Sequence, residues 1–169
     1  DALPPELGEI FADCALILHA GDICREWVLD ELRAIAPVVA VLGDHDRLGG
    51  LDLPAHTTVD IDGVRIGLIH GRRRYGLEVA VTLTTVLTFG RLRWNARLHR
   101  SLLRRTGPVD VLIHGHWHMP VHRLVGRTLV FSPGAVCPWG SLSGGRRPGQ
   151  GFTGVADRVV RRFRRLQGA

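Results

Sequence analysis

The stretch Val38-Val-Ala-Val-Leu-Gly-Asp-His-Asp46 runs from an apolar segment of strand type directly into a glycine and three polar side chains. The same arrangement occurs three more times: residues 15–19 lead to Gly21-Asp22, residues 64–69 to His70-Gly71, and residues 109–113 to His114-Gly-His116-Trp-His118. Each apolar run is typical of a buried strand, and a glycine beside a polar residue allows the backbone to approach a ligand closely. Carboxylates and imidazoles together suit Zn, Mn and Fe. The recurrence predicts strand ends that gather around a cation, as in a metal-dependent hydrolase.

The rest of the sequence predicts an α/β domain. Helices are expected at 4–13, at 26–35 before Pro37, and at 78–89 and 91–105. Residues 79–89 also alternate with the period of a strand, but a crossover between two buried strands favours a helix there. Asp62-Gly63 and Gly126 predict two hairpins, which join 57–61 to 64–69 and 121–124 to 128–131. With a glycine-rich flexible loop at 141–151 and a closing strand at 154–166, we expect a layered fold with a mixed sheet or two packed sheets.

Composition narrows the class of protein. The chain has 169 residues, which predicts one domain, and no apolar run long enough to cross a membrane. Three cysteines without paired spacing suit reduced thiols and a cytoplasmic location. The net charge of +6 comes from 22 basic residues that are all arginine. Solvated arginine faces explain this charge better than a nucleic-acid surface, because no basic stretch interleaved with aromatic residues is present.

The candidate ligands follow four strands, and the carboxyl ends of strands in open α/β sheets meet in one crevice. We therefore expect Asp22, Asp44, His70 and His116 to surround one cation, with His118 aimed to the same side if the backbone is extended there. Purely structural roles are a helix N-cap for Asp22, a polar turn for Asp44 and His45, and a hydrogen-bonded strand end for His70. His19 and His114 would either support a ligand by a hydrogen bond or simply be buried. Arg72 would contact phosphate or, by default, solvent.

As an ordered set, these motifs resemble the calcineurin-like metallophosphoesterase superfamily, and in particular its small bacterial phosphodiesterases and the related retromer subunit. The segments Leu3-Pro-Pro-Glu-Leu7 and Ser132-Pro-Gly-Ala135 are similar to the same branch. The resemblance implies an α/β fold, an α-β-β-α four-layer sandwich with mixed sheets, and two divalent ions, for which Mn, Zn, Fe or Ni are options. It also implies hydrolysis of a small phosphodiester or phosphomonoester by a metal-activated hydroxide. The sequence leaves the oligomeric state open, with an oligomer as one option.

The resemblance also implies roles for single residues. Asp22 matches the aspartate that bridges the two ions. Asp44, His70 and His116 match ligands of the second ion, and His118 matches a ligand of the first. His45 matches the residue that contacts the phosphate and protonates the leaving group, and Asp46 would orient it.

Two departures from the family pattern lead to further expectations. The family begins with a D-x-H motif that binds the first ion, and this sequence lacks it. We therefore expect an N-terminally incomplete single domain over 1–169, with a helical insertion at 72–106 and with one bound ion or none. Asp44 stands where the family has asparagine, which adds negative charge beside the cation and removes an amide donor. This departure favours an alternative function, a catalytically weak or inactive protein-interaction scaffold. A nucleic-acid-binding module that uses the arginines is a third, less favoured hypothesis.

Overall fold

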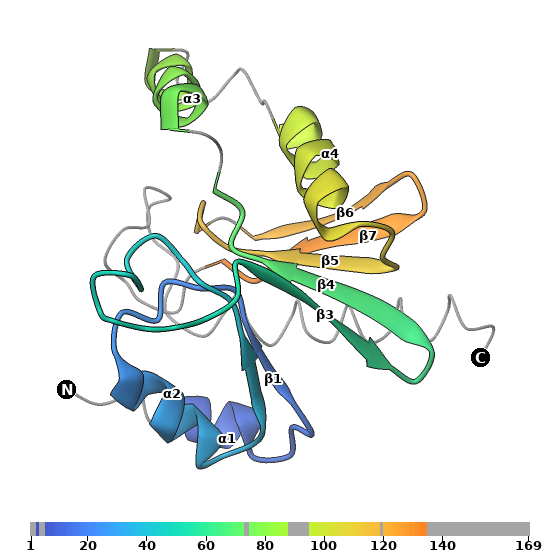
Figure 1. Cartoon of the computed structure of the whole chain (residues 1–169). Helices are drawn as coiled ribbons and strands as arrows, with labels where there is room; N and C mark the ends of the chain where they lie inside the picture. The colour runs from blue at the N-terminus through green and yellow to red at the C-terminus, as the bar shows by residue number, and fades with distance from the viewer. Residues whose placement is uncertain (1–2, 4–5, 73–74, 88–94, 119, 135–169) are drawn as a thin grey trace.

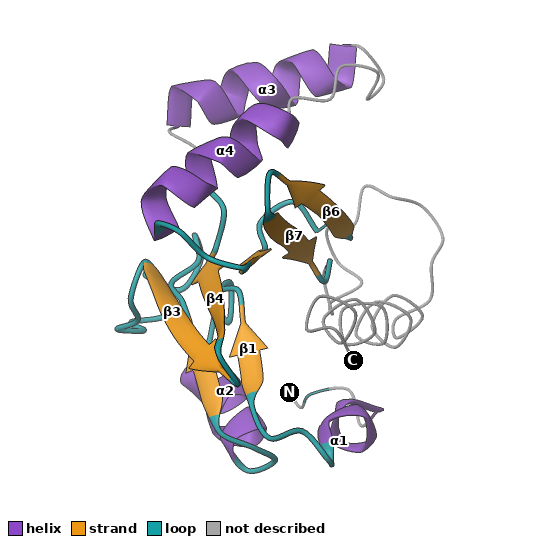
Figure 2. Ribbon diagram, turned by 90° about the vertical axis from the view of Figure 1, so that its right-hand side faces the viewer, coloured by secondary structure: helices purple, strands orange, loops and turns teal. Residues whose placement is uncertain are grey.

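The computed structural model describes residues 3, 6–72, 75–87, 95–118 and 120–134, and these residues form four layers (Figures 1 and 2). Helices α1 (Glu6–Phe11) and α2 (Glu26–Arg33) cover a small sheet, and a larger sheet lies between that sheet and helix α4 (Asn95–Thr106). Helix α3 (Tyr75–Leu87) lies beyond α4 at the outer end of the molecule. The α-β-β-α sandwich expected from the sequence is confirmed.

The small sheet is a βαβ unit. Strands β1 (Ile17–His19) and β2 (Val38–Ala40) pair in parallel, and α2 connects them. Leu29 and Leu32 of α2 are buried against the apolar side chains of the two strands and their loops. This burial requires the amphipathic spacing that the sequence shows at 26–35. The two strands therefore end side by side, and their carboxyl ends carry the loops with Asp22 and Asp44.

The larger sheet has the strand order β3-β4-β5-β7-β6. Its strands are β3 (His56–Ile61), β4 (Val64–Ile69), β5 (Val111–His114), β6 (Val121–Val125) and β7 (Thr128–Ser132). Strands β4, β5 and β7 are parallel to their neighbours in this group, whereas β3 and β6 are antiparallel edges. The β3–β4 turn has positive φ at Asp62 and Gly63, as a two-residue hairpin requires. Both predicted hairpins are confirmed.

The sheets and helices share apolar layers. Between the two sheets, Leu18 of β1 packs against a cluster that includes Val111 and Leu129. On the opposite face, Leu98 and Leu102 of α4 are buried against Ile69 and neighbouring side chains of the larger sheet. The packing of the sheets against each other brings the carboxyl ends of β1, β2, β4 and β5 together at one edge.

The region between β4 and β5 is helical in its described parts. Helices at 75–87 and 95–106 replace the predicted ranges of 78–89 and 91–105. The strand-like alternation does not prevail over residues 79–87, where no strand among the described residues pairs with the chain. Whether 72–106 is an insertion stays a prediction. The predicted loop at 141–151 and strand at 154–166 lie outside the described residues. No described helix is both long and apolar enough to span a membrane.

Candidate metal centre

Three side chains from three different strand ends meet at the edge where the sheets join. Asp44 follows β2, His70 follows β4 and His116 follows β5, and one potential ligand atom of each lies within 4.8 Å of the other two. Asp44 Oδ2 is 3.1 Å from His116 Nδ1 and 3.7 Å from His70 Nε2. The two imidazole rings are 5.1 Å apart and nearly perpendicular. Ligands around a four-coordinate cation are separated by comparable distances, so small shifts of these side chains would close the site on an ion.

The imidazole of His70 is oriented by the backbone of the neighbouring sheet. His70 is 4% exposed, and its Nδ1 lies 2.7 Å from the carbonyl oxygen of Ala20. A carbonyl can only accept, so Nδ1 carries the proton and the Nε2 lone pair of the neutral ring faces Asp44. Histidine ligands of metals are commonly oriented in this way by a hydrogen bond from the second nitrogen. The residues present therefore fit a divalent cation.

The electrostatic environment favours positive charge at this centre. Burial alone would lower the pKa of His70. The protonated ring, however, donates to Asp22 and to the Ala20 carbonyl and lies near the Asp44 carboxylate, and these interactions raise the pKa above its ordinary value. Burial likewise opposes ionisation of Asp22, yet the hydrogen bonds from His70 and from the backbone of His45 hold the pKa of Asp22 well below its usual range. A proton on His70 and a cation at the centre thus compete for the same negative surroundings.

Asp22 flanks the three potential ligands. Its Oδ2 is 3.3 Å from His70 Nε2, and its Oδ1 accepts a hydrogen bond of 3.0 Å from the backbone N–H of His45. Asp22 has a φ of 60°, a left-handed conformation that aspartate tolerates better than most residues. The structure therefore brings Asp22 beside Asp44, His70 and His116, as the sequence predicted.

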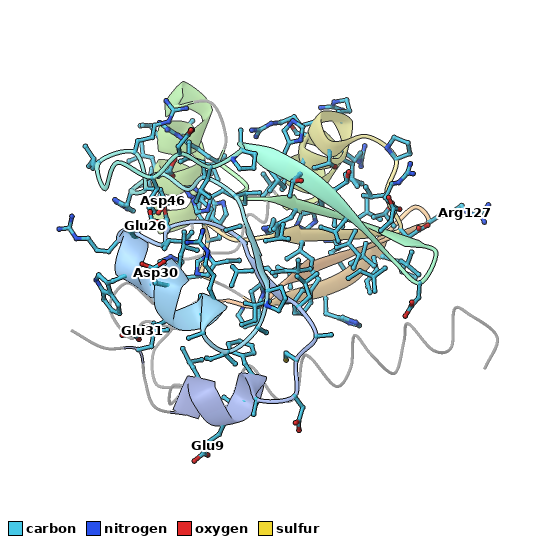
Figure 3. The ribbon with its side chains drawn as sticks, turned by 60° about the horizontal axis from the view of Figure 1, so that its bottom comes forward. Glu9, Glu26, Asp30, Glu31, Asp46 and Arg127 are labelled. Atoms are coloured by element: carbon cyan, nitrogen blue, oxygen red, sulfur yellow. The ribbon has the colours of Figure 1, made fainter. Side chains whose placement is uncertain are left out.

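Asp46 holds the loops that carry Asp22 and Asp44. Its side chain is fully buried, and its carboxylate accepts hydrogen bonds from the backbone N–H groups of Asp22 (3.0 Å), Cys24 (2.8 Å) and Gly43 (2.6 Å). In Figure 3 it is labelled just above Glu26, the first residue of α2. The described contacts of this carboxylate are with backbone amides of the two loops, and an orienting role of Asp46 toward His45 stays a prediction.

Glycine is required where these two loops touch. A Cβ on Gly43 would collide with the backbone nitrogen and the carboxylate of Asp22. A Cβ on Gly21, which has a φ of 91°, would lie 2.8 Å from His70 Nδ1. The glycines that the sequence places beside the polar residues thus let the loops pack backbone to backbone.

The remaining predicted residues are placed as follows. His45 is exposed, and its backbone, rather than its imidazole, contacts Asp22. His116 and His118 have φ values of 72° and 51°, so the backbone is not extended there, which was the condition for aiming both side chains to the same side. His118 does not join the described group of three. The Nδ1 atom of His19 accepts a hydrogen bond from Gly21, and burial lowers the pKa of this histidine. His114 is buried; it donates to the carbonyl of Gly115, and its ring lies against His99 of α4.

Arg72 has a contact that the sequence did not predict. Its Nη1 is 3.1 Å from Asp44 Oδ1, on the side of the carboxylate away from the two histidines. Its position two residues after His70 was the available signal, but the default assignment of a basic run is to solvent. The pairing depends on β2 and β4 ending at the same edge.

Comparisons with known proteins agree with this arrangement. A family model described as a calcineurin-like phosphoesterase superfamily domain matches residues 1–151. The chain is similar to a probable metallophosphoesterase of Methanothermobacter thermautotrophicus, with 35% identity over 133 residues, covering 79% of this chain and 67% of that protein. It is also similar to a probable metallophosphoesterase of Methanocaldococcus jannaschii, with 33% identity over 144 residues, covering 83% of this chain and 65% of that protein. The match thus spans about two thirds of these relatives.

A solved structure supports the same fold. The structure of Vps29 from Entamoeba histolytica in complex with Zn²⁺ is similar, with a TM-score of 0.54 and 25% identity, covering 80% of this chain and 66% of that one. This neighbour is described as a zinc complex.

Proposed function

The chain belongs to the calcineurin-like phosphoesterase superfamily, and we propose that it is a metal-dependent hydrolase of small phosphodiesters or phosphomonoesters. One observation carries this proposal: Asp44, His70 and His116 converge within 4.8 Å, and the backbone holds His70 with its lone pair toward the others. A carboxylate and two imidazoles form a ligand set that borderline divalent cations accept. His45, in the loop that carries Asp44, is exposed.

We assign the cation to Asp44, His70 and His116, with Asp22 beside it. When bound there, a divalent cation supplies Lewis acidity: it lowers the pKa of water and neutralises charge on a phosphoryl group. A second ion would use Asp22 and His118, neither of which belongs to the described group of three potential ligands. One ion per chain is therefore the expected stoichiometry, and manganese is the first cation to test.

The protein's own residues then have distinct tasks. Asp46 positions the loops through its three amide contacts, so that Asp22 and Asp44 keep their separation. His45 extends from the same loop toward solvent and is the candidate general acid for the departing alkoxide, since a histidine is able to donate a proton near neutral pH. No covalent intermediate with the protein is required.

The test is hydrolysis of bis(4-nitrophenyl) phosphate and 4-nitrophenyl phosphate by protein stripped with EDTA and reloaded with Mn²⁺, Zn²⁺ or Ni²⁺. We expect turnover that depends on added metal and disappears in Asp44→Ala and His116→Ala. His122→Ala, which changes an exposed histidine of β6, is the matched control and should keep the activity. Stoichiometric metal binding without any turnover would contradict the proposal.

The role of His45 needs a separate test, because nitrophenolate leaves without a proton. His45→Gln should slow hydrolysis of an alkyl phosphate by a factor of about 100 or more, whereas the nitrophenyl ester should be much less affected. Equal effects on both esters would exclude His45 as the general acid.

One observation favours the alternative, a protein-interaction scaffold with a weak site. Val79, Leu83 and Leu87 recur every four residues on α3 and are 50–70% exposed, which leaves an apolar stripe on the outer helix. Single exposed apolar residues need no explanation, but a helical stripe is typical of binding surfaces. The same assay separates the two functions: turnover supports the hydrolase, and bound metal without turnover supports the scaffold.

A further inference from the structure

Three arginines line a pocket next to the metal centre. The pocket has a volume of about 110 Å³ and lies between the loops that follow β2 and β4 and the end of α4. Arg47, Arg72 and Arg105 come from these three separate elements. Gly43, Asp44 and His70 also line the pocket, so that it shares a wall with the candidate metal centre.

Arg72 connects the pocket to the centre. Its guanidinium pairs with Asp44 Oδ1 at 3.1 Å, while Oδ2 of the same carboxylate faces His116 and His70. Arg105 donates a hydrogen bond of 3.0 Å from Nη1 to the backbone carbonyl of Arg72. The last turn of α4 therefore holds the loop that presents Arg72. These contacts fix Arg72 and the end of α4 relative to the metal centre, while the arginine side chains stay exposed to solvent and accessible to a ligand.

The charge of the pocket is unbalanced. Three arginines line it, and Asp44 is the one carboxylate among its described lining residues. Asp44 is also the residue assigned to the cation, which would leave the arginines with less negative charge still. Arginines from separate elements repel one another unless an anion lies between them, and a guanidinium binds phosphate oxygens in a bidentate geometry.

We propose that this pocket binds a second phosphate group of the substrate, beside the phosphoester held at the metal centre. The pocket volume suits a phosphate group with a few waters. The inference rests on the proposed hydrolase function and narrows it: the substrates are phosphoesters that carry another phosphate close to the scissile one. The arginines then select the substrate, and Asp44 separates the two phosphate positions.

The first experiment tests the pocket without metal or catalysis. Inorganic phosphate is titrated into protein in EDTA, and binding is followed by calorimetry or NMR at low ionic strength. We expect Arg105→Gln and Arg47→Gln each to weaken phosphate binding about tenfold, the effect of one lost charge-assisted hydrogen bond. Arg105→Lys should recover part of it. Arg104→Gln is the matched control, because Arg104 is the exposed neighbour on α4 and does not line the pocket.

The second experiment tests selectivity in the manganese-loaded protein. Nitrophenol release is compared for the 4-nitrophenyl ester of thymidine 5′-phosphate with and without a 3′-phosphate. We expect the 3′-phosphate to lower KM in the wild type, and Arg105→Gln to reduce the ratio of kcat/KM between the two substrates about tenfold. Arg104→Gln should keep the ratio of the wild type.

Negative results in the two experiments refute different parts of the proposal. If phosphate affinity in EDTA is equal in the wild type, Arg105→Gln and Arg47→Gln, the pocket is not a phosphate site, whether or not the protein hydrolyses esters. A 3′-phosphate that gives no advantage in an active wild type would overturn its assignment to the substrate. A third outcome is a protein that binds phosphate through the arginines but hydrolyses neither ester. It would contradict the proposed hydrolase and this inference about its substrate, and the pocket would then be only an anion-binding site.

Discussion

Replacing Asp46 by asparagine should destabilise the protein and loosen the metal centre together. Asp46 is fully buried, and its carboxylate accepts three backbone N–H groups from two loops. An asparagine keeps one acceptor oxygen and places an amide donor against at least one of these N–H groups. One hydrogen bond to a charged acceptor, worth about 1.5–3 kcal/mol, is then lost, and the others become neutral and weaker. We expect the free energy of unfolding to fall by about 2–4 kcal/mol.

The measurement is urea unfolding in EDTA, with fluorescence and circular dichroism as probes, followed by titration with Mn²⁺. Asp52→Asn is the matched control, since Asp52 is an exposed aspartate of the same loop region and should change stability by less than about 0.5 kcal/mol. Asp46→Asn should also weaken Mn²⁺ binding, because Asp22 and Asp44 lose their common anchor. An Asp46→Asn protein with the unfolding curve of Asp52→Asn would refute the reasoning.

Three further predictions concern the same centre. Gly43→Ala should lower the unfolding midpoint and abolish Mn²⁺ binding measured by calorimetry, because its Cβ collides with Asp22. The control Gly8→Ala, in open space on α1, should leave Mn²⁺ binding and the unfolding midpoint close to wild type or stabilise the protein slightly. Because the pKa of His70 is raised in the folded protein, the stability of the metal-free protein should decrease as the pH rises from about 6.5 through that pKa, while Mn²⁺ affinity increases over the same range. The melting temperatures measured with Mn²⁺ and with EDTA should therefore differ more at pH 8 than at pH 6. A difference that is independent of pH would argue against His70 as a ligand. Asp44→Asn, which restores the amide of the family pattern, should weaken Mn²⁺ binding about tenfold by calorimetry through the lost charge, and unchanged affinity would argue against ligation by Asp44.

Much of the fold follows from local rules, which is why it could be predicted. Asp62-Gly63 requires positive φ at both positions of a two-residue turn, so the turn fixes its hairpin without help from the rest of the chain. The apolar spacing of α2 likewise determines which face is buried. Residues 79–89 carried two conflicting periodicities, and the described part of this segment, up to Leu87, is a helix with no described strand paired to it.

In the candidate site too, some features follow from the local sequence and others only from the tertiary structure. The residue types and their order along the chain identified Asp22, Asp44, His70 and His116, because the chemistry of a ligand belongs to the side chain itself. The sequence around His70 does not indicate that His70 donates to Ala20, 50 positions earlier in the chain. The sequence around His116 and His118 likewise does not indicate their left-handed backbone conformation. These features arise when two sheets pack and their strand ends meet.

Composition and periodicity, which depend on neighbours a few positions away, were therefore sufficient for the class of fold, and the order of the motifs along the chain was sufficient for the family. The set of metal ligands stays a prediction. The buried anchor at Asp46, the orientation of His70 and the position of Arg72 on Asp44 required the three-dimensional arrangement. Each joins loops that are 20 to 50 residues apart in the chain, and hydrogen bonds of about 3 Å between such segments exist only after the sheets have come together.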